Sequence, residues 1–424
     1  MSKIEELIQQ YCPDGVEYKK FEDVFNTITD YTAAGSFKSL ADNVKYLKVP
    51  DYAMLIRTTD IKSNFSKGDF IYISKSAYDY LWRVKLDKEC IVLPNVGNCG
   101  EVYYIKPDDL PYENCALAPN AILVRSSIFN NRFLYHYLQV GAFQKQLSKI
   151  TSPVGQSKFN KTELKKLIIP IPPLPVQEEI VRILDNFAEL QAELQAELQK
   201  RLQQYNYYRD NLLSFEGRTD VEWKKLGEIV RSLTTGLNPR QTFKLNVDGA
   251  TYPYITGKDI FNNSINPSSK TDKISFDVIE RINKRAKLED DMLLFASTGT
   301  GTVGRMAYIQ KYSNDWSISE TLYAIKTKSL LNTRYFMYYL TTEMAIGQYR
   351  GKISKGSVPH LKIADLMNVV IPIPSMEEQH RVVELLCHFD TLVNDITAGL
   401  PAEIEARRKQ YEYYRDKLLT FKKK

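Results

Sequence analysis

Two stretches decide the architecture because they are nearly the same: YNYYRDNLLSF at 205–215 and YEYYRDKLLTF at 411–421. Three further pairs of segments are displaced by about the same ~205 positions. They are VEYKKFEDV at 16–24 with VEWKKLGEI at 221–229, IIPIP at 168–172 with VIPIP at 370–374, and QEEIVRILDNF at 177–187 with QHRVVELLCHF at 379–389. Displacements this similar indicate that the chain contains two copies of one unit.

Each copy begins with a globular part of roughly 150 residues, a size typical of one domain. Short apolar runs bounded by Gly and Asn predict strands in both copies. The runs are CIVLP at 90–94, EVYYI at 101–105, DMLLF at 291–295 and RMAYI at 305–309. A helix-like run follows at Arg132–Leu147 and at Arg334–Tyr349. The globular parts match only loosely, whereas the helical parts match closely. Two similar scaffolds with different surfaces indicate one task performed on two different targets.

Each copy ends in a long helical pattern. A continuous helix from Gln177 to Phe215 would be ~58 Å long at about 1.5 Å per residue, and it needs another apolar face for stability. We expect that face to be its repeat at 379–421, paired antiparallel about a pseudo-twofold axis; the alternative is a helix packed into a compact domain. Gly399-Leu400-Pro401 should break or kink the second helix.

These patterns predict an α+β protein with two mixed α/β domains, joined by two long antiparallel helices of coiled-coil type and related by internal duplication. The expected segments are an N-terminal arm at 1–16, a first domain at 17–174, a central spacer helix at 175–216, a second domain at 217–374 and a C-terminal spacer helix at 375–424.

Residues 188–199 consist of AELQ three times over. Leucines spaced by four residues turn by roughly 40° per step relative to a straight seam. The run is either filler, which only favours helix formation, or a ruler, whose length sets a distance along DNA. Each AELQ unit adds ~6 Å of helix, about two base pairs of duplex axis.

The composition is that of a soluble globular protein: 424 residues, 43% hydrophobic, and 57 basic against 51 acidic side chains. The start MSKIEELIQQ has no apolar run of signal-peptide type, and no stretch approaches the ~20 apolar residues of a membrane span. Five widely spaced cysteines read as free thiols. We therefore expect a cytoplasmic protein without a membrane partner.

Catalytic motifs are not recognisable. GTGTVG at 299–304 fits G-x-G-x-x-G, but RMAYIQKY after it reads as a strand, so a turn is favoured over a nucleotide site. The chain has no P-loop and no [DN]-P-P-[YF] tetrad, and its four histidines lack metal spacing. His136 is favoured as a packing residue over a catalyst. Because no candidate catalytic group recurs in both copies, we expect a noncatalytic recogniser that holds no metal or cofactor.

A basic segment closes each globular part around a Gly/Ser turn, whose backbone N–H groups suit phosphate oxygens. The alternative is a solvated helix face with a charged loop. The phosphate-binding candidates are Lys145, Lys149, Ser152, Gln156, Ser157, Lys158 and Lys161 in the first copy, and Arg350, Lys352, Ser354, Lys355, Ser357 and His360 in the second.

Other basic or polar loops carry side chains of the kinds that read base edges. The base-reading candidates are Arg57, Thr58, Lys62, Arg83, Asn95 and Asn98 in the first copy, and Thr256, Lys258, Ser297, Thr298 and Thr300 in the second.

The duplication, IPIPPLPVQEEIVRILDNF, the AELQ run and the two YYRD segments together resemble the specificity subunit of type I restriction-modification enzymes, over nearly the whole chain. The resemblance implies that two target-recognition domains each read half of a bipartite, asymmetric site in double-stranded DNA. It also implies that the helices set the gap and bind two methyltransferase (modification) subunits, and that restriction/translocase subunits join them. S-adenosylmethionine, ATP and Mg²⁺ would then belong to those partners.

On this resemblance the residues expected on the spacer and partner-docking helices are Leu190, Leu194, Leu198, Tyr205, Tyr208, Phe389, Ile396, Tyr411 and Tyr414. The helix length predicts a nonspecific gap of about 5–8 base pairs. Two other classes stay open: a noncatalytic scaffold whose globular parts bind proteins, and an enzyme such as a nuclease or methyltransferase.

Overall fold

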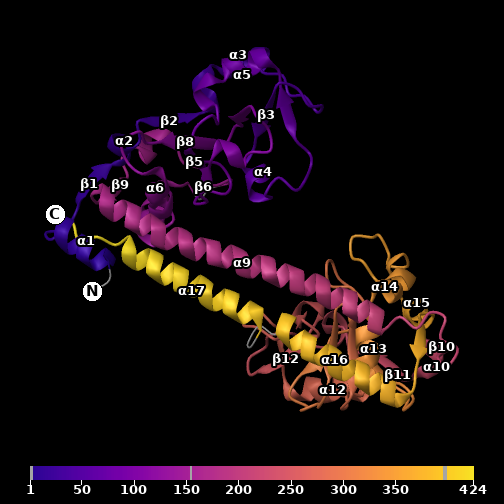
Figure 1. Ribbon diagram of the computed structural model, residues 1–424. Helices are drawn as coiled ribbons and strands as arrows, with labels where there is room; N and C mark the ends of the chain where they lie inside the picture. The colour runs from indigo at the N-terminus through magenta and orange to yellow at the C-terminus, as the bar shows by residue number, and fades with distance from the viewer. Residues whose placement is uncertain (1–2, 153–154, 395–398) are drawn as a thin grey trace. The chain divides into compact units, whose positions relative to one another are not determined.

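The computed structural model describes residues 3–152, 155–394 and 399–424 (Figure 1). The chain forms two compact units. The first comprises Met1–Ala192 and Ala406–Lys424, and the second comprises Glu193–Glu405. Each unit therefore contains the globular part of one copy together with a helical segment that the other copy supplies.

The first copy of the repeat is built from short strands and helices followed by one long helix, α9, which belongs to the second unit from Glu193 onward. Its elements are α1 (Lys3–Tyr11), β1 (Glu17–Lys20), α2 (Phe21–Val24), β2 (Thr27–Asp30), η1 (Tyr31–Ala34), α3 (Phe37–Asn43), β3 (Ala53–Ile56), α4 (Thr58–Lys62), β4 (Ile71–Ile73), α5 (Lys75–Tyr80), η2 (Trp82–Val84), β5 (Cys90–Pro94), β6 (Tyr103–Ile105), η3 (Pro107–Asp109), β7 (Cys115–Leu117), β8 (Ala121–Arg125), α6 (Asn131–Leu138), α7 (Gly141–Ile150), α8 (Lys161–Leu164), β9 (Ile168–Ile171) and α9 (Leu174–Leu212).

The second copy follows a similar order, and its last helix, α17, belongs to the first unit from Ala406 onward. Its elements are β10 (Glu222–Lys225), α10 (Leu226–Ile229), β11 (Val230–Thr235), α11 (Pro239–Thr242), β12 (Tyr252–Ile255), η4 (Gly257–Asp259), β13 (Ile260–Phe261), β14 (Ser264–Ile265), β15 (Lys273–Ile274), α12 (Phe276–Ala286), β16 (Met292–Ala296), β17 (Met306–Ile309), β18 (Ser317–Ile318), β19 (Leu322–Thr327), α13 (Thr333–Leu340), α14 (Glu343–Arg350), α15 (Ile363–Met367), β20 (Val370–Ile373), α16 (Met376–Asn394) and α17 (Leu400–Leu418).

The duplication extends to strand order. A four-stranded sheet runs β2-β8-β5-β6 in the first unit and β11-β19-β16-β17 in the second. A three-stranded sheet runs β4-β3-β7 or β15-β12-β18, with one antiparallel and one parallel pairing in each case. The antiparallel pairs β1–β9 and β10–β20 even share their register, since Glu17 faces Ile171 and Glu222 faces Ile373. The two copies therefore share the topology of these sheets despite their different globular sequences, and among the described residues the second copy adds the hairpin β13–β14.

Both units bury helix segments from both copies. The core of the first unit includes Ile180 and Leu184 of α9 together with Leu419, which follows α17. A core of the second unit includes Leu386 of α16 and Tyr205 of α9. The long helices thus belong to the domain cores, because their apolar stripes are buried against the sheets and helices of each unit.

Each long helical segment is fastened to its own domain by one buried glutamine. Gln177 donates to the Pro172 carbonyl oxygen over 2.7 Å and accepts from the Asn130 N–H over 3.2 Å. Its repeat equivalent, Gln379, donates to the Pro374 carbonyl over 2.9 Å and accepts from the N–H of Asn332 over 2.8 Å. Asn130 and Asn332 cap α6 and α13, so each glutamine joins the start of a long helix to the start of a domain helix.

Most local expectations are confirmed. The predicted strand at 90–94 is β5, and the strands expected at 101–105, 291–295 and 305–309 differ from β6, β16 and β17 by one or two residues at an end. GTGTVG lies between the antiparallel strands β16 and β17, so it is a turn region. The helix α9 has the expected 39 residues but begins and ends three residues earlier. The break expected at Gly399-Leu400-Pro401 is also present, because Gly399 is not helical and the helix α17 begins at Leu400.

One expectation was wrong. The helix-like runs at Arg132–Leu147 and Arg334–Tyr349 are not single helices but the pairs α6–α7 and α13–α14. The second helix of each pair has its N-cap at an extended β-branched residue, Val140 or Thr342, and the Thr342 hydroxyl accepts from the Ala345 N–H. The apolar period continues across the turn, so the sequence pattern hid the break. Ile396, expected on the second long helix, lies outside the described residues.

Candidate nucleic-acid interface

The base-reading and phosphate-binding candidates of the first copy meet in two adjacent loops. These are Asn95–Gly100 after β5, and Ser152 with Gly155–Lys158 before α8, called here the first paired loops. The Gly97 N–H donates to the Ser157 carbonyl over 2.8 Å, and the Phe159 N–H donates to the Asn95 carbonyl over 3.1 Å. Gly97 has a φ of +83°, and a Cβ there would lie 3.2 Å from Nε2 of Gln156. Asn95, Asn98, Ser152, Gln156, Ser157 and Lys158 are therefore gathered in one place.

The second copy has the same construction. The loops Ser297–Gly304 and Ser354–His360 are called here the second paired loops. The Gly299 N–H donates to the Pro359 carbonyl over 3.0 Å, and the Leu361 N–H donates to the Ser297 carbonyl over 2.8 Å. The hydroxyl of Thr298 lies 2.7 Å from Nδ1 of His360. The candidates Ser297, Thr298, Thr300, Ser354, Lys355, Ser357 and His360 are thus also brought together.

Not every side chain of the paired loops is on the surface. Asn98, Gln156 and Lys158 are exposed in the first pair, and Thr300, Ser354, Lys355 and Ser357 are exposed in the second. Ser297 is fully buried, and its hydroxyl donates to the Thr321 carbonyl over 2.9 Å. The surface of the second loop is therefore presented by its turn residues rather than by Ser297.

The remaining phosphate candidates flank these loops. Lys145 and Lys149 are exposed on α7, and Lys352 is exposed after α14. Lys161 is ion-paired with Asp30 over 2.9 Å, and Arg350 approaches Glu343 to 3.8 Å. Basic side chains thus continue along the helices that lead into each pair of loops.

The candidates at 57–62 and 256–258 are repeat equivalents on α4 and η4. In both segments a buried aspartate accepts from the backbone N–H of the residue before the helix, Asp60 from Arg57 in one copy and Asp259 from Thr256 in the other, each over 2.9 Å. The Arg57 guanidinium pairs with Asp60, and Thr58 is half-buried. Lys62 pairs with Glu101, while Thr256 holds the cap and Lys258 is exposed. Arg83 is exposed and stacks on the Trp82 ring, 4.9 Å from its centroid.

Two cavities occur at the same place in the two copies, and the sequence analysis missed the arginine in each. The first unit has a cavity of about 590 Å³ whose lining includes Gly100, Glu101 and Arg415. The second unit has one of about 350 Å³ whose lining includes Gly304, Arg305 and Arg209. In both cases the arginine comes from the long helix of the other copy. Its recurrence in YYRD was the signal that could have identified it.

Neighbouring groups position these arginines. Arg209 donates to Asp210 over 2.7 Å and to Asn206 over 3.0 Å, and Arg415 donates to Asp416 over 2.9 Å. In the first cavity burial opposes ionisation of Glu101, but hydrogen bonds from Lys62 and Tyr103 outweigh it and lower its pKa. In each unit, a positively charged guanidinium therefore lines the same cavity as the glycine that ends the first of the paired loops.

The helix candidates are divided between core and surface. Leu190, Tyr208 and Tyr414 are partly exposed, Leu194 and Leu198 are half-buried, and Tyr205 is buried. Tyr411 and Phe389 pack against the cores of the first and second units respectively. The exposed members are those that remain available to a partner.

Buried His136 has the packing role favoured by the sequence. Its Nε2 lies 2.8 Å from Asp185, which also accepts from Arg132. Burial lowers the pKa of His136, although Asp185 opposes the shift. Among the described residues, no three His, Cys, Asp or Glu side chains are grouped closely enough to hold a metal ion. The helices within the described ranges also include none that is long and apolar enough for a bilayer.

The chain matches the family described as the type I restriction modification DNA specificity domain twice, at residues 13–204 and 219–406. It is 36% identical over 270 residues to the specificity subunit of the Escherichia coli type I restriction enzyme EcoR124I/EcoR124II, which covers 61% of this chain and 64% of that protein. A type I specificity subunit of Haemophilus influenzae is 33% identical over 308 residues, 69% of this chain and 72% of its own length. The chain thus spans slightly less than two thirds of the first relative.

Solved structures agree on the fold. The S subunit of a type I restriction-modification system from M. genitalium aligns over 96% of this chain and 97% of its own, with a TM-score of 0.51 and 14% identity. A chain from a structure of type I restriction-modification complex assembly covers 96% of this chain and 98% of its own, with a TM-score of 0.58 and 15% identity. Because the two family matches cover most of the sequence and coincide with the duplicated fold, this chain belongs to the type I restriction-modification DNA specificity family.

Proposed function

We propose that this protein reads a bipartite, asymmetric site in double-stranded DNA, with one half-site bound by each unit. The observation that carries this proposal is the recurrence of paired loops. In both copies a polar loop after a sheet strand is hydrogen-bonded to a Gly/Ser loop flanked by lysine or arginine. Backbone N–H groups and basic side chains position a duplex through its phosphates, whereas polar side chains between them can read base edges. Because the two units carry different residues on the same scaffold, they would recognise half-sites of different sequence.

The chain itself is proposed to be noncatalytic and to hold no cofactor. The family relatives are named specificity subunits, which supports a division of labour. Two methyltransferase subunits would dock on the long helices and supply S-adenosylmethionine, and restriction/translocase subunits would supply the ATP- and Mg²⁺-dependent steps. The complex would act on DNA in the cytoplasm, and the helices would set a nonspecific gap of about 5–8 base pairs.

The proposal is tested first by a genome-wide map of methylated adenines in cells with and without this gene. Loss of one split, asymmetric motif is the expected result and would name the target. Loss of an unbroken motif would mean that only one unit reads DNA, contradicting the bipartite mechanism.

A protein-binding scaffold is the second candidate, favoured only by the partly exposed helix positions. The salt dependence of DNA affinity separates the two, because phosphate contacts release counterions and the affinity then falls steeply with salt. If the chain does not bind duplex DNA even at low salt, the result supports the scaffold. Incubation of the purified chain with DNA, Mg²⁺ and S-adenosylmethionine should leave the DNA neither cut nor methylated.

A further inference from the structure

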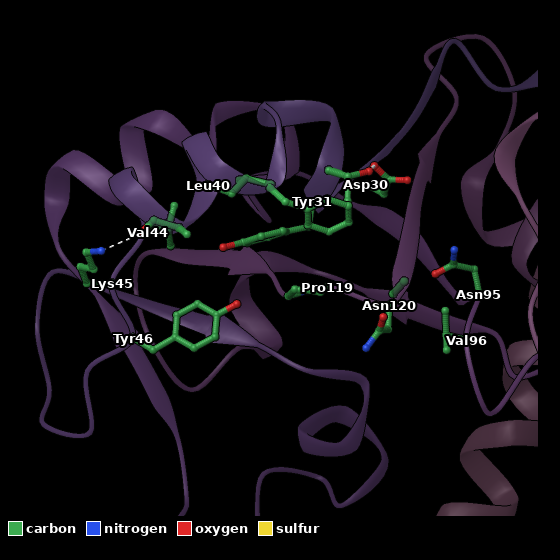
Figure 2. A pocket seen from close by; sticks show the side chains of 14 residues that line it. Asp30, Tyr31, Leu40, Val44, Lys45, Tyr46, Asn95, Val96, Pro119 and Asn120 are labelled. Carbon is green, nitrogen blue, oxygen red and sulfur yellow. Dashed lines mark hydrogen bonds between the residues drawn. The ribbon is translucent and has the colours of Figure 1, made fainter. Parts of the chain in front are cut away.

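A cavity of about 690 Å³ lies in the first unit beside the first paired loops. It is formed where β2 ends and β8 begins, beneath α3, and Figure 2 shows Tyr31, Tyr46 and Asn120 around it. This volume is within the range of roughly 300–1,000 Å³ that small-molecule sites occupy. The cavity is therefore large enough for a planar heterocycle.

The walls of this cavity are mainly apolar and aromatic. Tyr31 is buried, whereas Tyr46 is 51% exposed and Phe37, the first residue of α3, is 85% exposed. Burial raises the pKa of Tyr31, and a side-chain hydrogen bond with Tyr46 raises it further, so the two phenols adjoin at the cavity wall. Aromatic rings left uncovered at an apolar cavity offer faces on which another flat ring can stack.

The polar groups of the cavity suit a neutral base better than a phosphate. The Asn120 amide makes no hydrogen bond within the described ranges, and the Asn95 amide makes one long bond of 3.4 Å to the Phe159 carbonyl. An amide offers a donor and an acceptor side by side, the pattern that base edges require. The charged groups are already engaged, since Lys45 donates to the Ala41 carbonyl and Asp30 pairs with Lys161.

The position of the cavity links it to DNA. Asn95 and Val96 line the cavity and also belong to the first paired loops, and Val96 is bridged to Lys158. Asp30 joins the cavity to the phosphate candidate Lys161. A duplex held by the paired loops would therefore place its bases next to the opening.

We propose that this cavity is a nucleobase-binding site that receives one base unstacked from the first half-site. The inference rests on the proposed function. Removing a base from the stack costs free energy, and stacking on Tyr46 together with hydrogen bonds to Asn120 and Asn95 would offset that cost. A free nucleoside has the same chemistry, so the test separates the two sources.

The test uses the full-length chain without methyltransferase subunits and duplexes of the mapped target, each lacking one base. The variants are Tyr46→Ala and Asn120→Gly, because Asn120 has a φ of +73° and glycine keeps that backbone while removing the amide. Tyr11→Ala is the control, a tyrosine of the same unit that is 45% exposed and does not line the cavity.

At one position of the first half-site, loss of the base should change the affinity of the native chain and of Tyr11→Ala at least fivefold. The same loss should change the affinity of Tyr46→Ala and Asn120→Gly less than twofold. In parallel, adenosine, guanosine, cytidine and thymidine are titrated against each protein by saturation-transfer NMR. If no base position shows this difference but Tyr46→Ala abolishes nucleoside binding, the cavity is a site for a free nucleoside.

The inference is overturned if no base position shows this difference between the native chain and the variants and no nucleoside binds. If DNA binding by the native chain remains salt-dependent in that case, the proposed function stands and only the cavity assignment fails. If the chain binds no DNA at all, the proposed function fails, and the nucleoside titration still decides the cavity.

Discussion

Phe187 stacks on Tyr414 in the first unit, with ring centroids 5.6 Å apart and planes inclined by 21°. The two residues belong to different copies of the repeat. In the second unit Tyr208 and Phe389, their repeat equivalents with roles exchanged, stack at 6.0 Å and 16°. Each unit thus contains the phenylalanine of its own copy and the tyrosine of the other, which makes the stability of each unit dependent on both copies.

The first prediction concerns this exchange. A double-mutant cycle of Phe187→Ala and Tyr414→Ala should show a coupling of about 0.5–1.5 kcal/mol, the usual value of an aromatic pair. Urea unfolding at neutral pH gives the four free energies. The control cycle pairs Phe187→Ala with Tyr413→Ala, which is 62% exposed, and its coupling should be smaller. Equal couplings in the two cycles would contradict a specific stack.

The second prediction concerns the buried glutamines. Gln177→Ala leaves one carbonyl and one N–H without their partner, and Gln379→Ala leaves two carbonyls and one N–H, so each should cost about 1–3 kcal/mol of unfolding free energy. Gln195→Ala, an exposed glutamine of α9, serves as the control and should have little effect. Denaturant unfolding measures all three. If neither buried variant lowers the free energy of unfolding, water replaces the hydrogen bonds of the glutamine side chain.

The third prediction concerns pH. Because burial lowers the folded-state pKa of His136, its contribution to stability is complete above the unfolded pKa of about 6.5 and is lost as the pH falls below that value. His136→Tyr introduces the residue type of the second copy, Tyr338, and should flatten the dependence. The urea midpoint is measured between pH 5 and 7.5, with exposed His380→Gln as the control. Identical slopes for His136→Tyr and the native chain would refute it.

The fourth prediction concerns the paired loops. Lys158→Ala and Lys355→Ala should weaken binding to all duplexes about equally and reduce the slope of log affinity against log salt by about 1. Fluorescence anisotropy at several salt concentrations gives that slope. Lys311→Ala is the control, an exposed lysine after β17, at the end of the strand away from the loop. A change in base preference instead would show that these lysines do not contact phosphate.

The fifth prediction concerns the AELQ run. Removing residues 196–199 shortens α9 by ~6 Å and should shift the nonspecific gap by one or two base pairs, about the axial rise of that length of duplex. Adenine-methylation mapping in cells reads the gap. A four-residue insertion in the exposed turn at 247–249 should leave the gap unchanged. If the shortened helix keeps the original gap, the run is filler rather than a ruler.

The sequence anticipated features that local patterns encode. Repeated segments established the duplication, an unbroken apolar period predicted α9, and RMAYI after GTGTVG predicted a turn rather than a nucleotide site. It did not anticipate the breaks at Val140 and Thr342, because an apolar period can continue across a turn that only the backbone reveals. No local pattern indicates that the candidates for base contact and those for phosphate contact adjoin, because they are about 60 residues apart in each copy.

By itself, the sequence determined that the chain is duplicated, that each copy ends in long helices and that the two surfaces differ, because periodicity and repetition are properties of neighbouring residues. Only the tertiary structure decided that Gly97 bonds to Ser157, that Gly299 bonds to Pro359, and that Arg209 and Arg415 each enter a cavity of the other copy's domain. Those contacts join residues far apart in the chain. They depend on the order of strands in the sheets and on the direction in which each side chain projects from its helix. Local sequence patterns predict neither of these properties.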